Sequence, residues 1–338
     1  MADRNFMKID IHAHIVPATI FSIIEKRRNE FPSVQMISSA DGYSFSFSGG
    51  QKTRPVSSRL IDPVIRQAWM EKQGIDRQIV GGWLDIFGYE LPAEEGALWA
   101  QMMNQELLKA TIDEKSKLTA LACVPLQSGP LAAKVLHEAM DKGFPGVMIG
   151  TQPKGNGGNL DDPDLYPFWE AASERNAVIF IHPMYACGDD RLLDYDLINA
   201  VGRGTDTTIA VSRLLFSGHI TRYSGVKFVI SHGGAALPFM LGRLERHHSL
   251  NAKTLSDPIE AFKKLYFDTV LFDPAALLFL MEKVGSDKVM MGSDFPFAIG
   301  DLEPANIISH LDLSEVDLGS ILGKNAARIF NLSGCNCC

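Results

Sequence analysis

Short apolar, β-branched runs recur along the whole chain and alternate with longer segments in which apolar residues have helical spacing. Runs of this kind are typical of buried strands, whereas apolar positions three and four residues apart are typical of helices that cover a core. The pattern predicts eight strands, at 7–13, 77–83, 118–125, 145–150, 177–183, 226–232, 265–269 and 288–294.

The segments between these strands predict helices at 93–114, 129–143, 164–176 and 275–285. Alternating strands and helices favour parallel strands joined by crossover helices, and eight such units predict a TIM-like (β/α)8 barrel, an α/β fold. A doubly wound open sheet is the rival architecture. No Gly-x-Gly-x-x-Gly follows the first strand, so a dinucleotide site has no support.

One stretch, 33–57, departs from this alternation. Its sequence YSFSFS alternates strictly between polar and aromatic residues, and turn signals flank it. This pattern predicts a β-hairpin inserted after the first strand. With this insertion included, we expect one barrel domain over 1–332, followed by a Cys-rich tail at 333–338.

Composition narrows the class of partner. The chain has 338 residues, of which 46% are hydrophobic, and a formal net charge of −8. Its Lys and Arg residues are scattered, which argues against nucleic-acid binding. No apolar stretch approaches the length of a membrane span, and the N-terminus has no signal-peptide core. We therefore expect a cytoplasmic protein with a small-molecule partner.

Metal-binding and proton-transferring side chains stand at the C-terminal ends of four predicted strands. His12 and His14 end the first strand, and residues two apart on a strand point to the same side. His182, His232 and Asp294 end the fifth, sixth and eighth strands. Because the C-terminal strand ends of a barrel converge on one mouth, these residues predict a single site.

Imidazoles and a carboxylate are the ligands of a divalent cation. Three neutral histidines and one aspartate suit Zn²⁺, and Mn²⁺ remains an alternative. Such a centre is net positive and lowers the pKa of a bound water. The fourth strand ends without the lysine that bridges binuclear barrel sites, since Lys154 follows four residues after Gly150. We expect one cation per chain and no organic cofactor.

The motifs at these strand ends resemble those of a known family. They are His12-x-His14, HP at 182–183, HGG at 232–234 and GSDFPF at 292–297. Together they are similar to the amidohydrolase superfamily. More narrowly, they resemble its branch around 2-amino-3-carboxymuconate-6-semialdehyde decarboxylase, and the similarity runs over nearly the whole chain.

The resemblance implies a role for each strand-end residue. It implies a (β/α)8 barrel with one zinc bound by His12, His14, His182 and Asp294, and it assigns His232 as the acid/base that acts on the metal-bound water.

Two arginines also match the family. The resemblance implies that Arg54 holds a substrate carboxylate and that Arg243 reaches the neighbouring site across a homodimer interface. A decarboxylase must hold carboxylates, and the planar guanidinium does so with two parallel hydrogen bonds.

The sequence departs from the decarboxylase pattern in two loops. Met184 follows the HP motif where the decarboxylase has tryptophan, and the stretch that contains Trp83 differs ahead of Phe87. We expect Met184, Trp83 and Phe87 to shape the substrate pocket, so the substrate itself is left open.

These observations predict a metal-dependent, non-oxidative decarboxylase (a carboxy-lyase) of a small unsaturated or aromatic carboxylate. In this hypothesis His232 or Asp294 moves a proton to the carbon that loses its carboxylate. An alternative is a metal-dependent hydrolase of a C–N or C–C bond in a related carboxylate. A third hypothesis is a metal-containing sensor or scaffold without catalysis.

Overall fold

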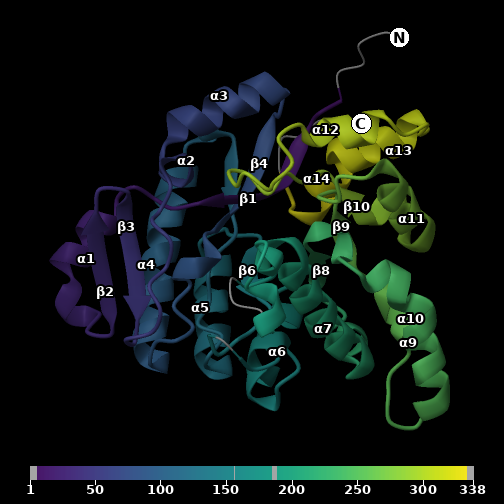
Figure 1. Ribbon diagram of the computed structural model, residues 1–338, viewed down its shortest axis with the longest axis horizontal. Helices are drawn as coiled ribbons and strands as arrows, with labels where there is room; N and C mark the ends of the chain where they lie inside the picture. Colours follow the sequence, from purple (N-terminus) through teal and green to yellow (C-terminus); the bar gives the residue numbers. More distant parts are fainter. Residues whose placement is uncertain (1–5, 156, 185–188, 333–338) are drawn as a thin grey trace.

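The structure is a computed structural model that describes residues 6–155, 157–184 and 189–332. The Cys-rich tail predicted at 333–338 lies outside the described residues. Figure 1 shows a central group of strands surrounded by helices, which is the layering expected of alternating strands and helices.

The central strands are parallel. All but the first lie within a predicted apolar run, and the first runs on to Ile15, two residues past its predicted end. In the described part of the chain they number eight: β1 (Ile9–Ile15), β4 (Arg77–Gly82), β5 (Leu118–Ala120), β6 (Gly146–Gly150), β7 (Val178–His182), β8 (Lys227–Ile230), β9 (Tyr266–Asp268) and β10 (Val289–Met290). Their side chains are almost all buried, as expected for a parallel sheet covered by helices.

The strands close into a barrel. The hydrogen-bonded orders are β1-β4-β5 and β10-β9-β8-β7-β6. Two isolated parallel bridges join these groups: Ala122 pairs with Val147, and Ala13 pairs with Phe295. The second junction is reinforced by a hydrogen bond from the His14 amide to the Phe295 carbonyl, at 2.7 Å. The (β/α)8 prediction is confirmed, and the open sheet is excluded.

Helices connect successive strands, and the four predicted helices are present as α4, α5, α6 and α11. Several helices begin with a side-chain cap and a proline in the first turn, as in α3, where Asp62 accepts from the Val64 amide. Within the described ranges the helices that follow β3 are α2 (Ser58–Ile61), α3 (Pro63–Gln73), α4 (Ala93–Thr111), α5 (Gly129–Asp141), α6 (Tyr166–Glu174), α7 (Arg203–Phe216), α8 (His219–Arg222), α9 (Leu237–Asn251), α10 (Pro258–Phe262), α11 (Pro274–Val284), α12 (Pro304–Ser309), α13 (Glu315–Gly319) and α14 (Asn325–Ile329).

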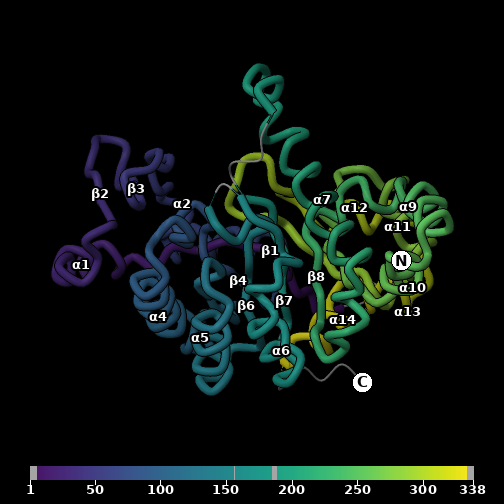
Figure 2. The backbone as a smooth tube through the Cα atoms, turned by 90° about the horizontal axis from the view of Figure 1, so that it is seen from below, coloured from purple at the N-terminus to yellow at the C-terminus, as the bar shows by residue number. Residues whose placement is uncertain are grey.

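The predicted hairpin insertion is present as β2 (Val34–Ser39) and β3 (Gly42–Phe47), which pair antiparallel. Together with α1 (Ile20–Lys26) it stands to one side of the barrel in both views (Figures 1 and 2). The rings of Phe31 and Phe47 each lie 5.5 Å from the ring of Trp99 on α4, so an aromatic cluster fixes the insertion to the barrel wall.

The segment that leaves the hairpin brings Arg54 to the barrel. It runs along β3, because the amides of Thr53 and Val56 donate to the carbonyls of Phe45 and Tyr43, each at 2.7 Å. These bonds give a loop residue a defined position beside the C-terminal strand ends.

Candidate metal centre

Four potential ligands meet at the C-terminal end of the barrel. His12 and His14 lie on β1, His182 is the last residue of β7, and Asp294 follows β10. All four are buried, and one ligand atom from each lies within 4.8 Å of the others. No other group of this kind was found among the residues that the structure describes. The strand-end pattern therefore does bring together residues that are nearly 300 positions apart.

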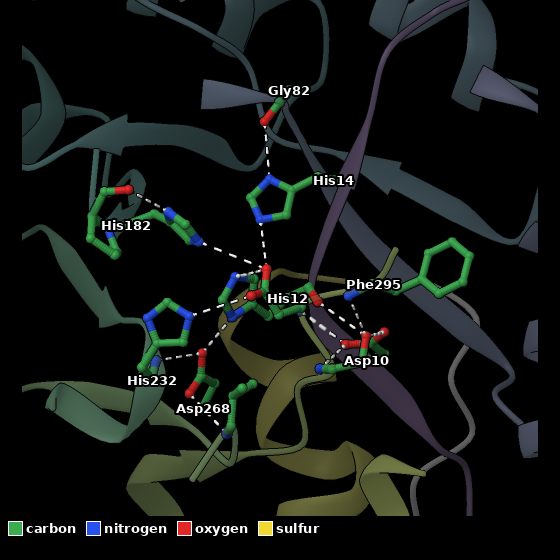
Figure 3. Close-up of polar contacts among 12 residues, drawn as sticks. Asp10, His12, His14, Gly82, His182, His232, Asp268 and Phe295 are labelled. Carbon is green, nitrogen blue, oxygen red and sulfur yellow. Dashed lines mark hydrogen bonds and ion pairs between the residues drawn. The ribbon is translucent and has the colours of Figure 1, made fainter. Parts of the chain in front are cut away.

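The outer nitrogen of each imidazole is already engaged. The Nδ1 atoms of His12, His14 and His182 lie 2.6, 3.1 and 2.9 Å from Asp268 Oδ2, the Gly82 carbonyl and the Pro183 carbonyl (Figure 3). Since each of these oxygens accepts a hydrogen bond, each Nδ1 carries the proton in the neutral ring. The lone pair of every Nε2 then points into the cluster, as in metal-ligating histidines.

The three Nε2 atoms surround one carboxylate oxygen. Asp294 Oδ1 lies 3.3, 3.1 and 3.9 Å from the Nε2 atoms of His12, His14 and His182. The Nε2 atoms of His12 and His182 are buried and form no hydrogen bond among the described residues. Lone pairs that face a carboxylate in a buried site are favourable only with a cation or a proton between them. The donor set therefore fits a divalent cation.

Without a cation, the pKa values of the residues in the cluster differ strongly from their usual values. Burial lowers the pKa of His12, but the carboxylates of Asp294 and Asp268 outweigh it and raise that pKa to about 10. Burial lowers the pKa of His182 well below its usual value. Although burial opposes ionisation of Asp294, its histidine neighbours hold the pKa of that carboxyl well below its usual range. In the absence of a cation, one proton is thus held at His12.

Asp268, at the end of β9, connects this cluster to His232. Its Oδ2 accepts from His12 Nδ1 and from the His232 amide at 2.9 Å, and its Oδ1 accepts from the Gly233 amide at 2.9 Å. His232 has a φ of 54°, a left-handed conformation that costs free energy in a residue with a side chain. The two hydrogen bonds from backbone amides to Asp268 stabilise this turn, and the same carboxylate orients His12.

A second buried carboxylate, that of Asp10, joins the strands behind the ligands through hydrogen bonds. Asp10 accepts from the hydroxyl of Ser293 at 2.5 Å and from Gln78 Nε2 at 2.7 Å. Arg66 donates to Gln78 Oε1 and to the His14 carbonyl, each at 2.5 Å. Burial raises the pKa of Asp10 to about 6, even though these hydrogen bonds oppose the shift. The network ties β1, β4 and the segment after β10 together behind the ligands.

His232 lies beside the ligands rather than among them. Its side chain is 20% exposed, and its Nε2 is 3.5 Å from Asp294 Oδ2, the oxygen turned away from the three imidazoles. It therefore contacts both the buried cluster and the open space above it, as an acid or base requires.

A cavity of about 330 Å³ opens over the cluster and suits a small substrate. Its lining includes His182, His232 and Asp294, together with Arg54 and Trp83. The guanidinium of Arg54 is 3.3 Å from Asp85, and its side chain is 45% exposed. The structure thus places the predicted arginine and tryptophan at the mouth of the metal centre.

The other predicted pocket residues lie elsewhere. Met184 lines an adjoining cavity of about 330 Å³ that shares Leu84 and Asp85 with the first. Phe87 is buried and is not part of the lining of either cavity; its ring fills the space that the missing side chain of Gly82 leaves. Arg243 is exposed on α9 and lies outside the cavity lining of its own chain.

Sequence reasoning gave no individual role to three residues of this region. Asp268 ends a predicted strand, so the strand-end criterion that selected Asp294 would have found it. Asp85 and Arg203 both line the cavity, but they lie after strand β4 and at the start of helix α7, where no periodic signal marks function.

Comparison with known proteins places the chain in context. The family described as Amidohydrolase matches residues 9–332. The chain is 30% identical to 2-amino-3-carboxymuconate-6-semialdehyde decarboxylase of Dictyostelium discoideum, over 96% of this chain and 92% of that protein.

Solved structures share the fold. A 5-carboxyvanillate decarboxylase from Novosphingobium aromaticivorans, complexed with manganese and 4-hydroxy-3-methoxy-5-nitrobenzoic acid, matches with a TM-score of 0.80 at 20% identity over 98% of both chains. A dihydroxybenzoic acid decarboxylase from Polaromonas sp., with bound manganese and 2-nitroresorcinol, matches with a TM-score of 0.78 at 20% identity over 97% of this chain and 98% of that chain.

Proposed function

The chain belongs to the amidohydrolase family, and from this premise we propose that it is a metal-dependent, non-oxidative decarboxylase of a small unsaturated or aromatic carboxylate. The observation that carries the proposal is the convergence of three imidazole Nε2 atoms on Asp294 Oδ1 at the base of a cavity that also contains an arginine. A decarboxylase needs both features, because it must hold a carboxylate and polarise the group beside it.

His12, His14, His182 and Asp294 would hold the cation. When bound, the cation supplies positive charge that polarises substrate oxygens and acidifies water. We infer Zn²⁺ from a donor set of three nitrogens and one oxygen, with Mn²⁺ as the alternative, since relatives contain manganese. No organic cofactor is part of the proposal.

Arg54 and His232 perform the remaining steps. Arg54 lines the cavity and would donate two parallel hydrogen bonds to the substrate carboxylate. When the bond to the leaving carboxylate breaks, its electron pair passes into the conjugated system of the substrate and CO₂ departs. The vacated carbon then takes a proton from His232 Nε2, and His232, whose side chain is 20% exposed, regains a proton from solvent. Trp83, Val270 and Phe297 surround this space with apolar surface that limits access of water.

We further propose a homodimer in which Arg243 reaches the site of the second copy. Its exposure on α9, and the lack of an ion pair to it within the described ranges, support this assignment. Light scattering of the active protein tests it: a dimer is expected, and a fully active monomer would contradict it. A cytoplasmic location stays a prediction; within the described residues, no helix is long and apolar enough to cross a membrane.

The test is CO₂ release from a panel of hydroxybenzoates and muconate-type acids, measured on metal-loaded and metal-stripped protein. We expect release that disappears on chelation and returns with Zn²⁺ or Mn²⁺. Release that survives complete removal of metal would contradict the proposal. A carboxylate product that carries solvent ¹⁸O, formed without CO₂, would instead favour the hydrolase.

A further inference from the structure

We propose that Leu84 limits the size of the substrate, because it separates the cavity over the metal centre from a second cavity into which a larger carboxylate would extend. The inference rests on the proposed function, since it narrows the substrate class to small acids without a long substituent on this side. Leu84 is thus a specificity-determining residue that takes no part in the chemistry.

The two cavities lie side by side, each with a volume of about 330 Å³. The segment after the hairpin supplies Arg54 to the first cavity and Thr53 to the second, and the chain at the end of β7 likewise borders both. Among the described residues, only Leu84 and Asp85 line both cavities. These two residues therefore form the partition between them.

The second cavity suits an uncharged group. Three large apolar side chains line it, those of Phe47, Leu84 and Met184. Its charged residues have both signs, since Lys52 accompanies two carboxylates. Burial of apolar atoms strengthens binding by a factor of about four for each methylene group. An alkyl substituent that passed the partition would therefore gain affinity.

The partition stands on a fixed turn. Leu84 begins the short 3₁₀ helix η2 (Leu84–Ile86), shortly after β4, and it is buried. The Ile86 carbonyl accepts from Trp99 Nε1 at 2.8 Å, which fastens the turn to α4. Because the backbone is held in this way, removal of the Leu84 side chain should leave a gap that the turn does not close. Asp85 pairs with Arg54 at 3.3 Å, so replacement of Leu84 opens the partition without breaking an ion pair.

Met184, on the far side of the second cavity, has little room to move. A Cβ atom at Gly150, the last residue of β6, would lie only 2.0 Å from Met184 Sδ, so the Met184 side chain packs directly against the strand end. The Met184 amide donates to Thr151 Oγ1 at 3.2 Å. A bulkier side chain at position 184 therefore has no space towards the strand and should fill the second cavity instead.

Binding of acids of different length tests the proposal. The probes are 2,6-dihydroxybenzoate and its 3-hexyl and 4-hexyl derivatives, which carry the chain in different directions from the ring. Calorimetry on the metal-loaded, full-length protein gives the affinity of each. The quantity compared between variants is the ratio of the affinity for a hexyl acid to the affinity for the parent acid.

Leu84→Ala should raise this ratio for at least one hexyl acid by about ten- to sixtyfold, which corresponds to two or three methylene groups that enter the second cavity. Leu84→Val, a smaller truncation, should give a smaller gain of the same sign. Ile86→Ala is the matched control. Ile86 is buried in the same turn but lines neither cavity, so its variant should keep the ratio of the wild type.

A second change should reverse the gain. In the double variant Leu84→Ala, Met184→Trp the new ring occupies the second cavity, so the ratio should return towards that of the wild type. The proposal is overturned if neither Leu84 variant raises the ratio, if Met184→Trp leaves the gain intact, or if the wild type binds none of the acids at millimolar concentration.

The proposed function fails in a different way. Because binding requires no turnover, a protein that shows the expected ratios but releases no CO₂ would contradict only the decarboxylase assignment. Metal-dependent CO₂ release with a ratio that no Leu84 variant changes would contradict only the size limit.

Discussion

The metal centre and the arginine-bearing wall of the same cavity are built in different ways. The ligands stand on or directly after strands β1, β7 and β10, and they are buried with fixed hydrogen-bond partners. The wall comes from the segment after the hairpin and from the start of α7, and Arg54 is almost half exposed. A barrel can therefore keep one cation chemistry on its strands while peripheral segments change the substrate.

Removal of a ligand should have the largest effect. His182→Ala should abolish turnover and weaken cation binding. The loss of affinity should exceed the factor of about 10 to 100 that is typical when a residue that hydrogen-bonds a metal ligand is removed. Metal content after dialysis, measured by mass spectrometry, checks it. The control is His310→Ala, because His310 is exposed, lies outside the cluster, and its Nδ1 lies 2.8 Å from the Asn306 carbonyl. A His182 variant that retains stoichiometric metal would show that the cluster is not the binding site.

The next effect separates chemistry from metal binding. His232→Asn should keep the cation, since His232 lies outside the four-residue cluster, yet lose about 10²–10⁴ in kcat, the usual contribution of a general acid or base. Metal analysis and turnover on the same sample decide it. Full activity in the variant would remove His232 from the mechanism.

A substitution of Asp268 tests whether cation binding depends on the residue that contacts His12 from outside the cluster. Asp268→Asn keeps the shape but removes the charge beside His12 Nδ1, so cation affinity should fall by about 10- to 100-fold. Competition with a fluorescent chelator measures this change. Asp273→Asn, at the N-cap of α11, is a control that changes the same group outside the cluster and outside the cavity lining. An unchanged affinity in the Asp268 variant would mean that His12 needs no orienting partner.

Metal binding should depend on pH with a definite sign. Without a cation the pKa of His12 is about 10, above its unfolded value of 6.5. Protonation of His12 therefore stabilises the metal-free fold fully below pH 6.5, and this stabilisation is lost as pH rises through about 10. A cation must displace this proton, and its affinity should rise about tenfold per pH unit between roughly pH 7 and 9. Calorimetry in buffers of different ionisation enthalpy measures the proton released; release of none would contradict the assignment.

A substitution in the cavity wall should have a smaller effect, and it should change KM rather than metal content. Arg54→Lys keeps the charge but loses the paired geometry, so KM for the carboxylate should rise by about tenfold while metal content is unchanged. Steady-state kinetics with metal analysis measures both. A loss of metal in this variant would show that the two regions are not independent.

The same contrast explains what the sequence could predict. His182 and Asp294 follow apolar runs and His12 stands on an alternating strand, so strand assignment located these three residues, and parallel topology made them converge. Asp268 also ends such a run, but its contact with His12 depends on barrel closure between residues 256 positions apart.

Residues off the strands left no periodic signal. Arg54 was found only through the resemblance, and Arg203 resembles any arginine at a helix start. Phe87 was predicted in the pocket, but Gly82 leaves room for its ring to pack inside.

The central claim is that four side chains from distant parts of the chain bind one catalytic cation. Anomalous scattering from crystals grown with Zn²⁺ or Mn²⁺ tests it most directly. We expect one strong peak per chain, about 2.0–2.2 Å from the Nε2 atoms of the three histidines and an oxygen of Asp294. A fully loaded, active enzyme whose anomalous peak lies away from these atoms would contradict the account.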